Sequence, residues 1–328
     1  MAGIGAPSRV TSVDVARRAG VSQSTVSLVL SGKGRGRISA RTEEAVRAAA
    51  AELGYRPNVA ARTLRTGIAR TVGLVVPDIT NPFFGPVLRG AQAAAMRAGY
   101  TVMLVDIARD RTWEAQSVEA LLAGPSDGLL LFASALPPGE TRPTIAIEML
   151  PGELPVVRLD VDDGVGQAVA HLLELGHRRI AHLAAAFEAP TFELREAGIR
   201  RRLAAAGLQP PPTVHSPITF AHAAEVAGEL LESGATAVLC DDDVLAGGAY
   251  LAARERGIRI PEEVSIVGFD DLAFAVVLDP PLTTVAVDAE QLGAVAFEAL
   301  EASLAGDSPP ADQVLPVRLV VRGSTAAP

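Results

Sequence analysis

Residues 11–32 read TSVDVARRAGVSQSTVSLVLSG, and this stretch decides the fold of the first part of the chain. Thr11 and Asp14 have the T-x-x-D spacing of a helix start, where the hydroxyl accepts a backbone N–H and the carboxylate suits the helix dipole. Gly20 can form the turn that follows, and Ser22 is placed to cap a second helix. We therefore predict two short helices joined by a glycine turn, the helix-turn-helix pattern.

The second of these helices has one apolar and one polar face. Val26, Val29 and Leu30 form the apolar stripe, so Gln23 and Ser24 are expected on the opposite, exposed face. In a helix-turn-helix the first residues of the second helix meet base edges in the major groove. Glutamine can read adenine through paired hydrogen bonds, and serine can serve several bases. The alternative is a small helical bundle whose polar face only contacts water.

A basic loop and a third helix come next. Residues 32–37, GKGRGR, lack the G-x-x-x-x-G-K-[ST] order of a nucleotide loop and follow no strand, so we reject that function. A flexible loop beside the DNA backbone is the simpler interpretation. Ser39 is expected to cap the third helix, with Val46, Ala50 and Leu53 on its buried face.

Residues 55–66 read YRPNVAARTLRT and have two interpretations. Pro57 breaks the preceding helix, and the segment after Asn58 has too little apolar surface to form a stable helix alone. It is either a solvated linker or a hinge that folds only on DNA. In a hinge, Leu64 would wedge between base steps in the minor groove while Arg62 neutralises phosphates.

The charge of the chain is unevenly distributed. Residues 1–66 hold 11 basic and 4 acidic residues, a net charge of +7, whereas residues 67–328 carry a net charge of −16. A basic head on an acidic body suggests that one end meets a polyanion. The single cysteine, Cys240, excludes an internal disulfide bond. No secretory signal and no apolar run long enough to span a membrane is visible, so we expect a cytoplasmic, nucleoid-associated protein.

Beyond residue 67, apolar runs alternate with amphipathic stretches. The continuous apolar runs are typical of parallel strands that are covered on both faces. Helical stretches lie between them, so the body is predicted to be α/β, with two doubly wound lobes joined by several crossovers. The strand candidates are 71–77, 101–106, 127–132, 155–160, 179–183, 236–240 and 264–269. The helical stretches lie near 83–98, 113–123, 164–175, 191–206, 221–233, 243–256 and 288–304.

The run from VTSVDVARRAG to ARTLRTG resembles the head and hinge of the lactose-repressor family of bacterial transcriptional regulators. The segments VGLVVPDITNPFF, LLELGHRRIAHL, VSIVGFDD, PPLTTV and LPVRLVVRGSTAAP extend this resemblance over essentially the full chain. It implies an all-α helix-turn-helix head on a body that resembles periplasmic sugar-binding proteins. It also implies a homodimer on near-palindromic operator DNA and a small effector, with a sugar or sugar-like polyol favoured. The expected boundaries are 1–57 for the head, 58–67 for the hinge and 68–328 for the body; lobe 1 spans about 68–158 and 288–312, and lobe 2 about 159–287 and 313–328.

The residues expected to bind DNA cluster in the two helices, the basic loop and the hinge. One departure from the family concerns Leu28, because the family often has arginine there, in S-T-V-S-R-V. Leucine cannot make the bidentate contact to guanine that arginine makes, so we expect a different operator base pair. The expected contacts are Thr11, Ser12, Val13, Ser22, Gln23, Ser24, Thr25, Ser27, Leu28, Lys33, Arg35, Tyr55, Asn58, Ala61, Arg62 and Leu64.

The residues expected to bind the effector follow the carboxyl ends of the strands, where ligands of such sheets bind. Carboxylates and one arginine can hold several hydroxyls, and Phe83 can pack on a ring face. Asp78 and Asp270 could instead be helix caps. Asp242 stands where the family usually has asparagine, in A-N-D, which removes an amide donor. The expected residues are Asp78, Asn81, Phe83, Phe84, Ser134, Asp160, Arg195, Asp242 and Asp270.

Other functions find little support in the sequence. Asp241–Asp243 could suggest a cation, but the chain lacks the ligand spacing of a calcium loop. His171, His177 and His182 do not form a convincing zinc set, and His177 is expected to make a structural hydrogen bond. With no catalytic motif, we expect no enzyme activity, no cofactor and no metal. The remaining alternatives are a solute-binding protein for transport and an α/β enzyme, neither of which would bind operator DNA.

Overall fold

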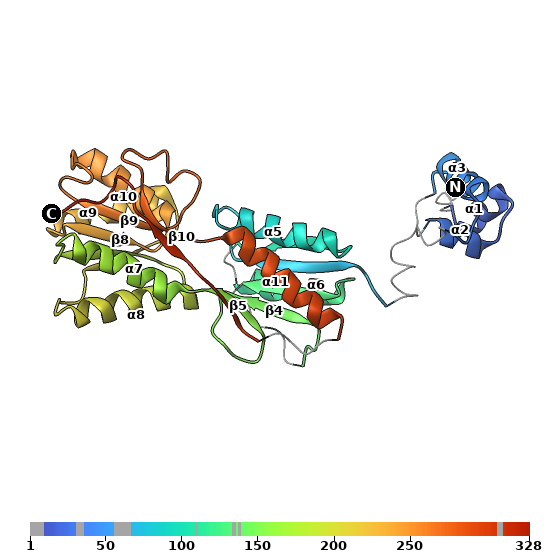
Figure 1. Cartoon of the computed structure of the whole chain (residues 1–328), viewed down its shortest axis with the longest axis horizontal. Helices are drawn as coiled ribbons and strands as arrows, with labels where there is room; N and C mark the ends of the chain where they lie inside the picture. Colours follow the sequence, from blue (N-terminus) through green and yellow to red (C-terminus); the bar gives the residue numbers. More distant parts are fainter. Residues whose placement is uncertain are drawn as a thin grey trace, which may run out of the picture. The chain divides into compact units, whose positions relative to one another are not determined.

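The structure is a computed structural model of the chain. It describes residues 10–30, 36–55, 67–108, 111–132, 136, 139–306 and 311–328. The chain divides into two compact units, a head within Met1–Ala69 and a body, Arg70–Pro328. Figure 1 shows both units coloured along the sequence. The described part of the head is helical, whereas the body alternates strands with helices.

The head contains helices α1 (Ser12–Ala19), α2 (Gln23–Leu30) and α3 (Ala40–Glu52). Thr11 and Asp14 form a capping box at the start of α1, and Gly20 ends that helix at φ 66°. The Ser22 hydroxyl accepts the backbone N–H of Thr25 at 3.2 Å. The Ser39 hydroxyl caps α3 in the same way. The helix starts and the glycine turn predicted from the sequence are therefore confirmed.

A small apolar core joins the three helices of the head. Val15, Val26 and Val46 are fully buried in it, and Val29 is buried too. Val15 comes from α1, Val26 and Val29 from α2, and Val46 from α3, so each helix turns its apolar stripe towards the core, as predicted. Tyr55 packs against the edge of this cluster, just after α3. The polar face of α2 is thereby left on the outside.

The first sheet of the body has six parallel strands in the order β11-β5-β4-β3-β1-β2. Helices α5 and α11 pack together on one face, and α6 covers the other (Figure 1). Because both faces are covered, the strands are apolar throughout. The elements are β1 (Thr71–Val76), α5 (Phe84–Arg97), β2 (Thr101–Asp106), α6 (Arg111–Ala123), β3 (Gly128–Phe132), β4 (Thr144–Ile147), β5 (Val156–Leu159), α11 (Ala289–Leu304) and β11 (Gln313–Leu315).

The second sheet also has six strands, in the order β12-β10-β9-β8-β6-β7. All neighbours are parallel except β12, which pairs antiparallel with β10. Helices α7 and α8 cover one face, and α9 and α10 the other. The elements are α7 (Val161–Glu174), β6 (Ile180–Ala185), α8 (Pro190–Ala205), β7 (Thr213–Ser216), α9 (Phe220–Glu232), β8 (Ala237–Cys240), α10 (Asp243–Arg256), β9 (Ser265–Asp270), β10 (Thr283–Ala286) and β12 (Arg318–Val320).

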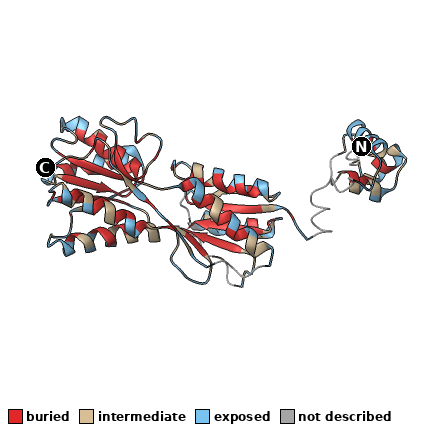
Figure 2. Ribbon diagram, viewed as in Figure 1, coloured by how far each residue is buried: buried red, intermediate tan, exposed pale blue. Residues whose placement is uncertain are grey.

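The two sheets form two lobes, and the chain crosses between them three times: after β5, after β10 and after β11. Figure 2 shows the buried strands at the centre of each lobe. The two-lobed, doubly wound α/β body is thus as predicted. One expected boundary is wrong: Gln313–Leu315 was assigned to lobe 2, but it pairs with β5 in the sheet of lobe 1. Among the described helices, none combines the length and apolar composition needed to cross a bilayer.

Candidate functional site

The polar face of the head is built from the ends of α1 and α2. Gln23 and Ser24 are exposed at the start of α2, and the Gln23 amide donates to the Ser12 hydroxyl at 2.9 Å. The Ser22 hydroxyl lies 2.7 Å from that of Ser24 and 2.9 Å from that of Thr25. These groups therefore form two small hydrogen-bonded sets on the surface where the recognition residues are expected.

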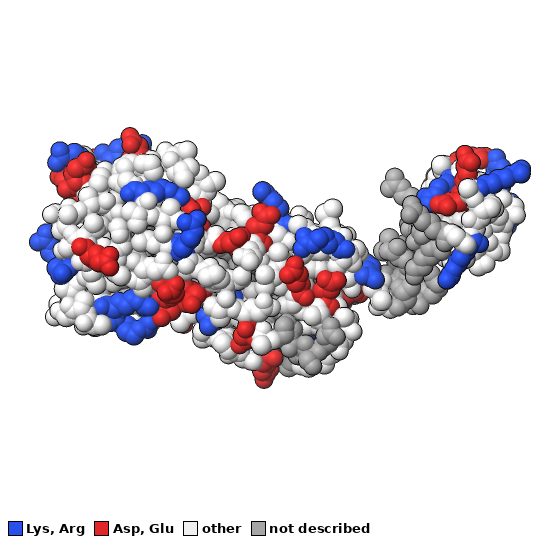
Figure 3. Space-filling model, in the orientation of Figure 1, with Lys and Arg blue, Asp and Glu red and all other residues white. Residues whose placement is uncertain are grey.

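Of the remaining expected DNA contacts, Thr11 caps α1, Tyr55 packs against the apolar core of the head, and others lie on α1 and α2 or outside the described residues. Val13 and Ser27 are exposed, and Leu28 is half-buried on α2. Basic side chains such as Arg17 and Arg37 are also exposed on the head, and Figure 3 shows basic side chains at its surface. Six of the expected contacts lie outside the described residues: Lys33, Arg35, Asn58, Ala61, Arg62 and Leu64.

The body contains a cavity of about 630 Å³, part of it open to solvent, at the carboxyl ends of strands from both lobes. The first lobe contributes Phe83 and Phe84, whose rings pack edge to face at 5.2 Å. The complete lining is Pro77, Asn81, Phe83, Phe84, Phe132, Glu148, Phe187, Ala189, Thr191, Phe192, Arg195, Ile218, Asp242 and Asp270.

Arg195, on α8, is the cation that lines this cavity. Its side chain is buried, with the guanidinium carbon 3.7 Å above the centre of the Phe269 ring and 5.2 Å from that of Phe192. One amino group donates to the main-chain carbonyl of Asp241, and the other lies 3.8 Å from the Asp270 carboxylate. The Arg195 Nε is buried and finds no hydrogen-bond partner among the described residues.

Three carboxyl groups surround the arginine. Burial raises the pKa of Asp242 to about 6, and the neighbouring Arg195 opposes this rise. Burial also raises the pKa of Asp270 well above its ordinary value, and that of Glu148 above its ordinary value. A carboxylate in such a place gains from ligand hydroxyls that donate to it. The cavity therefore combines phenylalanine rings with acceptors and one strong donor.

Local backbone geometry presents two of these carboxyl groups. Glu148 and Asp270 adopt positive φ angles, 56° and 110°, which non-glycine residues rarely adopt. Each lies at the carboxyl end of a strand, Glu148 directly after β4 and Asp270 at the end of β9. The main-chain N–H of Leu159 donates to Glu148 at 2.6 Å and holds its side chain. Such backbone strain is commonly kept where a side chain must be aimed at a ligand.

Asp242 has a second task besides lining the cavity. Its carboxylate caps α10 by accepting the N–H of Leu245 at 2.8 Å. The adjacent Asp243 is buried as well and accepts the Leu272 N–H and the Thr284 hydroxyl. Burial raises the pKa of Asp243 to about 7. The two consecutive acids are therefore held by separate contacts.

Of the nine residues expected from the sequence, six line the cavity, two do not and one lies outside the described residues. Asn81, Phe83, Phe84, Arg195, Asp242 and Asp270 line it. The Asp78 carboxylate accepts the N–H and hydroxyl of Thr80, which is a turn contact and not the helix cap offered as the alternative, because α5 begins after Phe83. Asp160 caps α7 through the N–H of Asp163. Ser134 lies outside the described residues.

The sequence analysis missed several residues that line the cavity, chiefly Glu148, Phe187 and Phe192. Glu148 escaped because the four-residue strand before it was not predicted. Phe187 follows a strand that was predicted, so the rule that ligands bind at carboxyl ends of strands could have found it. Phe192 is at the start of the helix after that strand, where the same rule applies less directly.

Metal ligation is not supported in the described ranges, which hold no cluster of three His, Cys, Asp or Glu side chains suited to a metal ion. His177 is bonded to the Thr236 hydroxyl and to the carbonyl of Ala326, each at 2.9 Å, so the predicted structural role is confirmed. Burial lowers its pKa and favours the neutral ring. The exposed Trp113 donates its ring N–H to the carbonyl of Asp106.

Comparison with known proteins identifies both parts of the chain. Residues 12–58 match the model of bacterial regulatory proteins, lacI family, and residues 169–325 match that of the periplasmic binding protein-like domain. The HTH-type transcriptional repressor CytR of Escherichia coli K12 is 33% identical over 331 residues, covering 97% of this chain and 96% of the relative. The ribose operon repressor of Halalkalibacterium halodurans is 35% identical over 322 residues, covering 95% and 96%.

Solved structures show the same similarity. The Lac repressor dimer bound to operator and the anti-inducer ONPF matches with a TM-score of 0.87 and 29% identity, over 97% of this chain and 100% of that one. A LacI family transcriptional regulator from Enterococcus faecium with bound ribose matches with a TM-score of 0.72 and 28% identity, over 79% and 99%. Over nearly its whole length, then, the chain belongs to the lacI family of bacterial regulatory proteins.

Proposed function

We propose that this protein is a cytoplasmic transcription repressor that binds a near-palindromic operator as a homodimer and is controlled by a sugar or sugar-like metabolite. The observation that carries the proposal is the combination, in one chain, of the capped helix-turn-helix and the cavity around Arg195. The relatives that cover nearly the whole chain are named as repressors, and the ribose-bound regulator supports a sugar as the class of effector.

The head supplies the DNA contacts in this proposal. The first turn of α2, with Gln23 and Ser24, would read base edges, and the exposed arginines would bind phosphates. The Gln23–Ser12 hydrogen bond holds the glutamine beside α1 in the free protein. On the operator, Gln23 would exchange this bond for one with a base. Residues 58–67 are proposed as the hinge, with Leu64 in the minor groove.

The cavity supplies the control. Its walls come from both lobes, so a bound ligand favours one arrangement of the lobes over another. Because coupling between two sites is reciprocal, an effector that weakens operator binding must itself bind more weakly to the DNA-bound protein. Hydroxyls of the effector would donate to Asp242, Asp270 and Glu148 while Arg195 donates to one of its oxygens. Phe83 and Phe192 would cover the apolar face of its ring.

A gel shift tests this function directly. The full chain is incubated with the DNA upstream of its own gene, and with a scrambled fragment of equal length, at several salt concentrations. A specific shift that weakens steeply with salt supports the proposal, because phosphate contacts release counterions. Adding sugars one at a time then identifies an inducer by loss of the shift, or a corepressor by its strengthening. No specific shift on any genomic fragment at low salt would contradict the proposal.

A further inference from the structure

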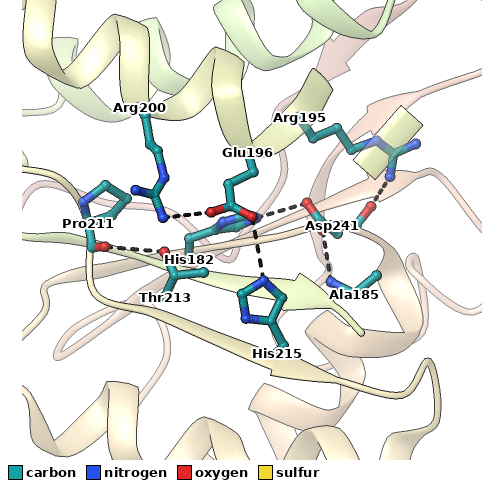
Figure 4. Close-up of polar contacts among 9 residues, drawn as sticks. All are labelled: His182, Ala185, Arg195, Glu196, Arg200, Pro211, Thr213, His215 and Asp241. Atoms are coloured by element: carbon teal, nitrogen blue, oxygen red, sulfur yellow. Dashed lines mark hydrogen bonds and ion pairs between the residues drawn. The ribbon is translucent and has the colours of Figure 1, made fainter. Parts of the chain in front are cut away.

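Asp241 is the most fully engaged of the buried acids, although it does not line the cavity. Its two carboxylate oxygens accept the His182 Nε2–H and the Ala185 N–H, each at 2.8 Å. Its main-chain N–H donates to the carbonyl of Leu183, and its main-chain carbonyl accepts from Arg195. Figure 4 shows Asp241 between the histidine on one side and the arginine on the other. Every polar group of Asp241 therefore makes a hydrogen bond, and its main-chain carbonyl bonds Arg195, which lines the cavity.

Arg195 has few other contacts that fix its position. Its distance of 3.8 Å from Asp270 is too long for a hydrogen bond. Stacking on Phe269 holds the plane of the guanidinium group but leaves it free to slide along the ring. Behind the arginine lies a second, smaller cavity lined by Cys240 and Ile199 among others. Since the contact with Asp270 is long, the bond to the Asp241 carbonyl sets where the guanidinium group lies.

His182 explains why the Asp241 main chain is so firmly held. The histidine is completely buried on β6, and its other ring nitrogen, Nδ1, has no partner among the described residues. Asp241 directly follows β8, and its side chain bonds two residues of the neighbouring strand β6, His182 and Ala185.

We propose that Asp241, braced by His182, is a positioning residue of the effector site, which acts by holding Arg195 at the cavity wall. This inference rests on the proposed function, because it takes the cavity as the effector site. The competing explanation is that the buried pair only stabilises the second lobe. The two explanations differ in what happens to Arg195 when the pair is replaced by apolar side chains.

The position of Arg195 can be read without knowing the effector. In the full chain labelled with [¹⁵N]arginine, the Nε–H of Arg195 should resonate upfield of other arginines, because the guanidinium group lies over the Phe269 ring. Arg195→Lys assigns this signal by removing it. In Asp241→Ala the signal should move towards the range of the other arginines. An unchanged Arg195 signal in a folded Asp241→Ala protein would overturn the proposal.

The conservative variant Asp241→Asn should restore the position of Arg195 that Asp241→Ala loses. In Asp241→Asn the amide oxygen can still accept the Ala185 N–H, and the amide can donate to His182 Nε2 once the ring proton moves to Nδ1. The Arg195 signal should therefore stay in place, while histidine ¹⁵N shifts report the exchange of tautomer at His182. Movement of the Arg195 signal in Asp241→Asn, as far as in Asp241→Ala, would contradict positioning through the side-chain brace.

The double variant His182→Leu/Asp241→Ala separates positioning from stability. Removing both partners leaves no unpaired histidine, and only the Ala185 N–H still lacks its acceptor, so the thermal midpoint should recover part of the loss seen in Asp241→Ala. The Arg195 signal should not recover, because the brace is still missing. Recovery of both would support a purely structural role. His177→Leu is the matched control, since this buried histidine bonds Thr236 and Ala326, and its loss should lower stability without moving the Arg195 signal.

The effect of Asp241 on function is tested by measuring the binding of D-ribose to wild type and to the variants. If wild type binds D-ribose, Asp241→Ala should weaken its binding at least tenfold, whereas Asp241→Asn should change it less than threefold. Equal affinity in wild type and Asp241→Ala would overturn the proposal. The arginine signal decides the inference even if D-ribose does not bind. A wild-type protein that answers to no sugar at all overturns the proposed effector class instead, which is a separate result.

Discussion

The side-chain amide of Asn81, in the first lobe, lies 3.4 Å from the carboxylate of Asp242, in the second. The two lobes are therefore linked by a hydrogen bond at the wall of the cavity itself. Asn81 is held for this by accepting the N–H of Phe83 at 2.9 Å, and Asp242 by capping α10. A ligand that binds either side chain changes the contact between the lobes.

The pKa of Asp242 predicts that effector binding depends on pH. Burial raises this pKa to about 6, so the group is mostly protonated at pH 5 and ionised at pH 7. Effector hydroxyls donate more strongly to the carboxylate than to the neutral acid. Affinity should therefore rise about tenfold between pH 5 and pH 7, as expected when binding requires loss of one proton with this pKa.

Asp242→Asn isolates this effect, because asparagine also caps helices well and the fold should be kept. Glu148 and Asp270 face the same cavity and contribute their own pH dependence in both proteins. The difference between wild type and variant, measured by titration calorimetry from pH 5 to pH 7, should show the rise. A variant whose affinity changes with pH as steeply as that of wild type would exclude Asp242 as the titrating group.

Asp243 predicts how the stability of the body depends on pH. Its pKa is about 7 in the folded protein, against 3.8 for an ordinary aspartate, so the folded state holds its proton over a range where the unfolded state has lost it. The contribution of this group to the free energy of unfolding is therefore largest below pH 4, falls as the pH rises to about 7 and is constant above.

Asp243→Asn should remove this fall in the free energy of unfolding between pH 4 and pH 7, because asparagine does not ionise. The amide oxygen can accept the Leu272 N–H, and the amide can donate to the Thr284 hydroxyl oxygen, so both contacts survive. Relative to wild type, the variant should be unchanged near pH 4 and more stable by roughly 2 to 4 kcal/mol at pH 8, from a pKa shift of about three units. Urea unfolding at the two pH values measures this, and equal stability of both proteins at pH 8 would show that Asp243 is ionised without cost.

Leu28 predicts a change in operator preference. This side chain is half-buried on α2, one turn after Ser24, and cannot donate a hydrogen bond to a base. Leu28→Arg should introduce a bidentate contact to guanine and change the preferred base pair at one position of each half-site by about 1–3 kcal/mol. Selection from random DNA with both proteins checks this. Recovery of one and the same half-site would show that residue 28 does not read a base.

The sequence predicted the fold well wherever the cause is local. Capping residues, the Gly20 turn and long apolar runs such as 71–76 depend on neighbours in the chain, and they were found. Five short strands were missed: β4, β7, β10, β11 and β12. Of these, β7 is partly exposed, and β11 gains its regular structure from pairing with β5. Such strands are set by tertiary partners rather than by their own pattern.

For the residues of the cavity, too, the sequence predicted what depends on local position and missed what depends on tertiary contacts. The rule that ligands bind at the carboxyl ends of strands found Asn81, Asp242 and Asp270, since each follows or ends a strand that was predicted. The rule alone could not separate these from Asp78, whose carboxylate is used by a turn two residues on. It could not reveal the buried contact between His182 and Asp241, which joins residues 59 positions apart in the chain.

Arg195 gives the sharpest test of how the cavity is connected to the head. Arg195→Ala should abolish the effector response while leaving operator affinity in the absence of effector unchanged, because the arginine lines the cavity of the body and its contacts with Phe192, Phe269 and Asp241 all lie within the body. Truncation also leaves a void and an uncompensated Asp270, so stability should fall by roughly 2–4 kcal/mol. Arg195→Met, which keeps most of the volume, separates packing from charge. If packing alone mattered, Arg195→Met would respond to effector in gel shifts as wild type does; if the charged donor is required, it should fail as Arg195→Ala does, with operator binding intact in both.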